Sequence, residues 1–164
     1  MEILDEIAPL LGSLAASSHV YSRCGTVSDT TIAEQVFGLV MIAQDDWADR
    51  AVAGAVGPAS AREIEAALEP VDAAGAIELM TDLSAFDLVH SRILLRDRDH
   101  AKRAAARVAK LLGPGTSWVT NMEGMGMGMG NGRGWTPVTR HGIDAVVAGS
   151  NGDQFAVLLA LGDD

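Results

Sequence analysis

The chain has 164 residues and a mass of 17.1 kDa, which is the size of one domain. Hydrophobic residues make up 48% of it and charged residues 21%, a composition that excludes a disordered or fibrous protein. Its formal net charge is −10, and the acidic residues gather in residues 1–90. Because a negative protein repels phosphate backbones, a nucleic-acid partner is disfavoured and a basic protein partner is favoured.

Two further features bear on the compartment and on metals. The longest apolar run, Phe37 to Ala43, is far shorter than a membrane-spanning helix requires. The first ten residues carry acids where a secretion signal has Lys or Arg, so we expect a cytoplasmic protein. A single cysteine, Cys24, and the lack of zinc-ligand spacing favour neither a disulfide nor a structural metal. No cofactor is predicted.

Four helices are predicted in residues 1–84. The first shows apolar residues at helical spacing around Pro9, which kinks that helix or fixes its first turn. Helix starts are predicted where a polar residue precedes such a pattern, at Thr31, Ser60 and Asp72.

The pattern then changes to a strand, helix and strand over residues 86–96, 99–112 and 116–122. Gly113 and Pro114 end the helix. Such a unit predicts a right-handed crossover with parallel pairing of its two strands.

A C-terminal β-hairpin is predicted over residues 142–148 and 154–161. Asn151 and Gly152 suit a two-residue turn, which would place Ala148 opposite Phe155. Both faces of the hairpin are apolar, so we expect helices or a second subunit to cover both sides. The sequence therefore predicts one α+β domain, 1–164, with a helical part in 1–84. Its layer of about four helices packs on a mixed sheet of about four strands in 85–164.

The most unusual stretch is residues 122–134, where glycine alternates with methionine. A flexible loop is predicted there, because repeated glycine does not fix a strand. Met125, Met127 and Met129, with Trp135 just beyond, suit an adaptable surface for a protein partner. Soft thioethers at this spacing also suit Cu(I), and a loop whose methionines pack onto the core is the third reading.

A second candidate contact lies in the acidic segment Asp45, Asp46 and Asp49. These residues have the letters of the DDxxD motif that binds Mg²⁺ through diphosphate, but no second acidic motif accompanies them. We expect a solvated acidic helix segment that contacts a basic partner.

Groups for catalysis are scattered in the sequence. His90, His100, Arg140 and His141, with Trp135, are the candidates for a hydrolase or transferase pocket under the Gly/Met loop. Cys24 near Arg23 and His19 is a candidate nucleophile. Spacing alone does not bring any of these groups together.

One local basic surface is predicted on the helix of residues 99–112, from Arg103, Arg107 and Lys110. Such a surface suits a solvated face, an RNA contact, or docking against the protein's own acidic helices. The negative charge of residues 1–90 favours docking against these helices.

Taken together, the sequence predicts a non-enzymatic protein-binding module of the inhibitor or immunity type, with a homodimer as a further expectation. A small hydrolase or transferase and a Cu(I)-binding loop are the alternatives.

Overall fold

The computed structural model describes residues 2–86, 88, 94–122 and 136–162. Its elements follow in the order α1 (Ile3–Leu14), β1 (Val20–Thr26), α2 (Ile32–Asp46), the 3₁₀ turn η1 (Ala48–Arg50), α3 (Ala61–Ala67), β2 (Glu69–Val71), α4 (Ala73–Ala85), α5 (Arg98–Leu112), β3 (Ser117–Thr120), β4 (Ile143–Ser150) and β5 (Gln154–Gly162). The α+β class predicted from the sequence is confirmed, and no helix in the described ranges is long and apolar enough to cross a membrane.

One five-stranded sheet, in the order β1-β5-β4-β3-β2, runs through the middle of the protein. Every pairing in it is antiparallel, so the predicted parallel crossover is wrong. Phe86 and Leu94 form only an isolated bridge in the segment predicted as a strand over 86–96, and residues 87 and 89–93 lie outside the described residues. The two additional strands are β1 and β2, whose polar or very short sequences show no strand pattern.

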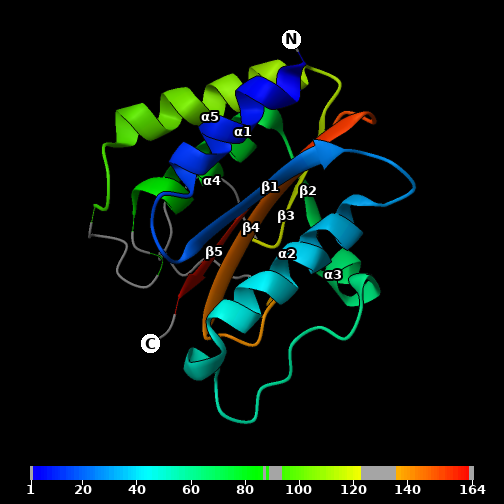
Figure 1. Ribbon diagram of the computed structural model, residues 1–164, viewed down its shortest axis with the longest axis vertical. Coiled ribbons are helices and arrows are strands. Elements are labelled where there is room, and N and C mark those ends of the chain that lie inside the picture. The colour runs from blue at the N-terminus through cyan, green and yellow to red at the C-terminus, as the bar shows by residue number, and fades with distance from the viewer. Residues whose placement is uncertain (1, 87, 89–93, 123–135, 163–164) are drawn as a thin grey trace.

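The β4–β5 hairpin forms the centre of the sheet, and both of its faces are buried as predicted (Figure 1). Helices α1, α4 and α5 cover one face, while α2 and α3 cover the other. The helices therefore form two layers around the sheet, because a hairpin that is apolar on both sides requires a cover on both sides.

The register of the hairpin differs from the predicted one by two residues. Ala148 pairs with Val157, and Ser150 pairs with Phe155. The reason is Asn151, whose Oδ1 accepts the N–H groups of Asp153 and Gln154 at 2.9 and 2.8 Å and so closes a longer loop. A shift of two preserves the side on which each side chain lies, so the predicted faces are correct.

The helix starts follow the predicted caps. The Thr31 hydroxyl accepts the Glu34 N–H, and the Asp72 carboxylate accepts the Gly75 N–H. At Ser60 the cap is different, because the Glu63 carboxylate reaches back to the N–H of Ala59 while the Ser60 side chain makes no capping bond. Gly113 ends α5 with a φ of +94°, a conformation that suits glycine.

A close contact between β4 and β3 leads to a prediction. A Cβ at Gly149 would lie 2.5 Å from the ring of Trp118, which is buried. We expect Gly149→Ala to lower the free energy of unfolding by about 1–3 kcal/mol through overpacking. Chemical denaturation measures this, with Gly115→Ala as the control, since no atom lies within 4 Å of its Cβ position. Equal stability of the two variants would contradict the close contact.

Candidate partner-binding surface

The outer face of α2 carries two large apolar side chains in the open. The buried positions of this helix, from Val36 to Ala43, face the sheet. On the opposite side Met41 is 46% exposed and Ile42 is 53% exposed. They share this side with the exposed residues Glu34 and Asp45, one or more helical turns away. An apolar centre with acidic neighbours is the usual make-up of a surface that binds a basic protein.

The three predicted acidic residues lie together where α2 ends. Asp45, Asp46 and Asp49 are all exposed, which agrees with the predicted acidic helix segment. Asp46 also accepts a hydrogen bond of 3.2 Å from the Tyr21 hydroxyl of β1. Burial of the phenol and this neighbouring carboxylate raise the pKa of Tyr21 to about 12, so the tyrosine remains a neutral donor that ties α2 to the sheet.

Beyond η1, the chain continues as an exposed segment to the start of α3. Val52 is 47% exposed and Val56 is 90% exposed. The segment ends at a pocket of about 420 Å³, which lies between α3 and residues 137–139 just before β4. The pocket is lined mainly by apolar side chains and backbone, and its one carboxylate is that of Glu63; the lining residues are Val56, Gly57, Pro58, Ala59, Glu63, Ile64, Pro137, Val138 and Thr139.

Hydrogen bonds hold this surface to the loop before β4. The Gln44 Oε1 of α2 accepts the Arg140 N–H at 2.8 Å, and the Gln44 carbonyl accepts from the Arg140 guanidinium at 3.1 Å. The Arg140 carbonyl in turn accepts the Val52 N–H at 3.2 Å. Gly57 packs against the Gln44 amide so closely that a Cβ would lie 2.5 Å from Oε1. The exposed segment is therefore fixed at both of its ends.

His141 occupies a structural position beside α2. Its ring is 5% exposed and meets the ring of Trp47 edge-on, at 5.7 Å between centroids. The Arg50 guanidinium lies over the same Trp47 ring, 4.8 Å from its centroid. The Nδ1 atom of His141 lies 3.4 Å from the Arg50 carbonyl, while its Nε2 has no partner in the part of the chain that the structure describes.

The fully buried carboxylate of Asp144 on β4 holds residues 138 and 139 of the preceding loop in place. It accepts hydrogen bonds from the N–H groups of Val138 and Thr139, from the Thr139 hydroxyl at 2.7 Å and from the Asn121 amide at 2.8 Å. The Asn121 Oδ1 also accepts the Val146 N–H at 2.8 Å. Burial raises the pKa of Asp144, and these hydrogen bonds oppose the rise.

The Asp144 anchor gives a stability prediction. In Asp144→Asn the new amide hydrogens face the donors of residues 138 and 139, so we expect the free energy of unfolding to fall by about 1–3 kcal/mol. Because the native pKa of Asp144 is raised, its contribution is largest below the unfolded pKa of about 3.9 and declines as pH rises through the native pKa.

Denaturation of wild type and Asp144→Asn from pH 3 to pH 8 measures both effects, because the carboxylates common to the two proteins cancel in the difference. The stability difference should shrink with rising pH. A difference that grows with pH would show that the hydrogen bonds outweigh burial.

Several predicted site residues are not brought together. Met125, Met127, Met129, Trp135 and His90 lie outside the described residues, so the predicted Met surface, the Cu(I) loop and the pocket beneath it stay predictions. His100 is exposed on α5, on the far side of the sheet from His141. Cys24 lies on β1, where burial raises the pKa of its thiol. Within the described ranges, no group of three His, Cys, Asp or Glu side chains is placed to hold a metal.

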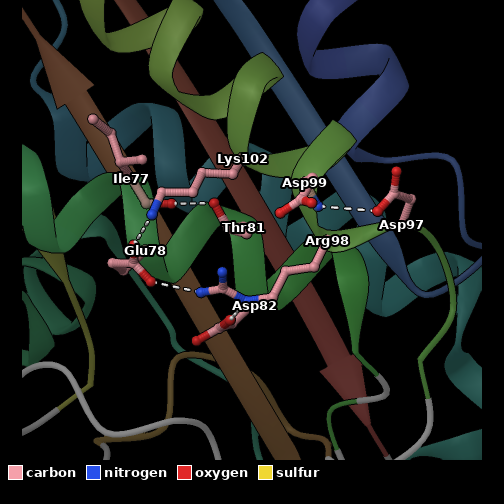
Figure 2. A network of polar contacts seen from close by, with 8 residues as sticks. All are labelled: Ile77, Glu78, Thr81, Asp82, Asp97, Arg98, Asp99 and Lys102. Atoms are coloured by element: carbon pink, nitrogen blue, oxygen red, sulfur yellow. Dashed lines mark hydrogen bonds and ion pairs between the residues drawn. The ribbon is translucent and has the colours of Figure 1, made fainter.

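The basic side chains of α5 pair with acidic helices of the same chain. Arg107 contacts Glu6 of α1 at 3.0 Å. Near the start of α5, Arg98 contacts Glu78 and Asp82 of α4 at 2.6 and 3.4 Å, and Lys102 contacts Glu78 at 3.0 Å (Figure 2). Of the three residues predicted to form the basic surface, Arg107 has an acidic partner in the same chain, and the readings of Arg103 and Lys110 stay predictions.

The contacts of Glu78 give a further prediction. The Lys102 ammonium, with help from Arg98, lowers the pKa of Glu78. Its stabilising contribution is therefore present above the unfolded pKa of about 4.3 and is lost as pH falls through the native pKa. We expect Glu78→Gln to cost about 1 kcal/mol or less at neutral pH, since the pair is exposed. Thermal denaturation should show this cost disappear at low pH or in 1 M salt, and Glu65→Gln on α3 serves as the control. A cost that persists under both conditions would contradict the ion-pair origin.

Comparison with known proteins gives no relative: no family model, no curated protein and no solved structure matches the chain. The function is therefore inferred from the geometry of the surface.

Sequence reasoning missed the apolar part of this surface. Met41 and Ile42 stand in the longest apolar run, which reads as core. The signal was present in the helical spacing, because buried positions at 36, 39, 40 and 43 leave 41 and 42 on the opposite side. Glu63 was assigned only to a helix cap, and no sequence signal places it at a pocket.

Proposed function

We propose that this protein is a non-enzymatic protein-binding module, of the inhibitor or immunity type, that binds a basic partner through the outer face of α2. The observation that carries the proposal is the exposure of Met41 and Ile42 beside carboxylates at the end of the same helix. Apolar contacts of this kind supply affinity, and the surrounding charges supply orientation and rate.

The surface continues past the helix. The exposed segment after η1 leads from Asp49 through Val52 and Val56 to the pocket beside Glu63. Its anchoring to Gln44 and Arg140 supports a role as a preformed surface, since a fixed segment loses less entropy when a partner binds. The carboxylate at the pocket suits a lysine or arginine side chain of the same partner, whose aliphatic stem would contact Pro58 and Pro137.

The sign of the charge narrows the class of partner. The protein carries a net charge of −10, and the basic residues that the structure pairs, Arg98, Lys102 and Arg107, lie in the other helical layer. The α2 face has bases of its own, Arg23, Arg50 and Arg140, but within the described residues none of them forms an ion pair with the carboxylates at the end of α2. A basic protein surface is therefore attracted over the last 8–10 Å or so of the approach.

A site-specific photo-crosslink tests the proposal. A photoreactive phenylalanine analogue replaces Ile42 on α2 or, as the control, the exposed Arg103 on the opposite layer. In the cells that make the protein, we expect position 42 to form an adduct with a basic protein and position 103 to form none. The adduct is identified by mass spectrometry. No adduct at 42, or the same adduct from both positions, would refute the assignment of the surface.

Charge reversal tests the electrostatic part. Asp45→Lys with Asp49→Lys should lower the yield of the position-42 adduct by about tenfold or more, because like charges across an interface are strongly unfavourable. The matched control is Asp5→Lys with Asp99→Lys, which makes the same change in net charge on exposed residues of α1 and α5. An equal loss in both double variants would mean that only the overall charge matters.

A further inference from the structure

Strand β1 is an edge of the sheet, and half of its backbone groups point away from the protein. The hydrogen bonds at its two ends, from Leu161 N–H to the His19 carbonyl and from Val27 N–H to the Asp153 carbonyl, show that odd-numbered residues bond to β5. In an antiparallel ladder the intervening residues direct both N–H and C=O to the other side. The even-numbered residues of β1 therefore face outward.

Three of these residues have both groups open. The Val20 N–H is already bonded to the Ser17 carbonyl at 3.1 Å. For Ser22, Cys24 and Thr26, no backbone partner on the outer side occurs among residues 2–86, 88, 94–122 and 136–162. Figure 1, in which β1 lies in front of the other strands, shows this edge between the two helical layers.

The two edges of the sheet are protected differently. Strand β2 has only three residues and includes Pro70, both of which discourage further pairing. Strand β1 has seven residues and no proline or lysine. Its one charged side chain, Arg23, lies over α2, where a Cβ on Gly38 would be 2.7 Å from the guanidinium. A long edge without such protection is suited to pairing with another strand.

We propose that two copies of this chain pair through β1 in an antiparallel manner, with the twofold axis at Cys24, so that the sheets join into one. In this register the open groups of Ser22 bond to the partner subunit's Thr26, those of Thr26 bond to the partner subunit's Ser22, and the two Cys24 residues bond to each other. All three open residues are satisfied by an identical strand, as an isologous interface requires. The inference is independent of the α2 surface.

The side chains disfavour the neighbouring register on one side. A shift of two residues toward the N-terminus would place Arg23 directly opposite the partner subunit's Arg23, and like charges in that position are unfavourable. It would also demand the N–H of Val20, which Ser17 already occupies. With the axis at Cys24, Arg23 instead lies opposite the partner subunit's Gly25, which has no side chain.

The single cysteine makes the test direct. Residues in a hydrogen-bonded antiparallel pair have Cα atoms about 5.5 Å apart, inside the range of about 4.4–6.8 Å for disulfides. Mild oxidation of the wild-type protein with copper phenanthroline should therefore yield a disulfide-linked dimer. Before oxidation, sedimentation equilibrium should give twice the 17.1 kDa mass of one chain. A monomer at the concentration used for oxidation would overturn the proposal. The outer edge of β1 would then either stay unpaired or pair with a different protein.

Moved cysteines test the register. Arg23→Cys in a Cys24→Ser background places the thiol at an exposed site but about 7–8 Å from its copy, beyond disulfide reach. It should crosslink at least about tenfold more slowly than wild type. In the same background, Ser22→Cys mixed with Thr26→Cys should crosslink, while each alone should not. Crosslinking of Arg23→Cys at the wild-type rate would refute this register.

An edge variant provides a measurement without cysteine chemistry. Ser22→Pro removes an outward N–H and leaves the β1–β5 bonds in place, so it should give a folded monomer by sedimentation and circular dichroism. A folded Ser22→Pro dimer would show that the copies associate elsewhere. If this variant fails to fold, the moved cysteines decide the question.

Discussion

The structure depends on one constraint, the burial of both faces of the β4–β5 hairpin. Both faces of these two strands carry mainly apolar side chains, so neither face can be left to water. A single helical layer would bury only one of the two faces. The chain therefore sends α1, α4 and α5 to one side and α2 and α3 to the other, and β1 and β3 flank the hairpin within the sheet. The position of the α2 surface follows from this division, because α2 is the long helix of the smaller layer.

A second, polar constraint shapes the end of the sheet near the candidate surface. Just before β4, the N–H groups of Val138 and Thr139 donate to the Asp144 carboxylate, and the N–H group of Arg140 donates to Gln44. These buried hydrogen bonds favour one arrangement of residues 138–140, because an alternative arrangement would leave their donors without partners. The exposed segment between η1 and α3 is held by the hydrogen bond from Val52 to Arg140 and by the packing of Gly57 on Gln44.

Much of this fold was predictable from the sequence, for physical reasons that differ between elements. The helices begin at side chains that accept backbone N–H groups, as at Thr31 and Asp72, and such local chemistry can be read directly. The hairpin faces were predictable because alternation survives a register shift of two. Strand β1 was not, since Ser22, Arg23 and Gly25 hide its alternation and its neighbour in the sheet, β5, lies far away in the sequence. For the candidate site, exposure of Asp45 was expected from its charge, whereas the pocket beside Glu63 arises from segments distant in sequence.

The pairing of β1 with β5 has a consequence for how the protein forms. Val20 and its partner Ala160 are separated by most of the chain, so this part of the sheet closes a very large loop. Such nonlocal contacts raise the contact order and slow folding. During synthesis, β1 emerges from the ribosome long before β5 does. The backbone N–H and C=O groups of β1 that pair with β5 therefore stay unpaired while the four helices α2 to α5 are translated. The sheet is completed only when β5 is available, because β5 lies between β1 and the other three strands.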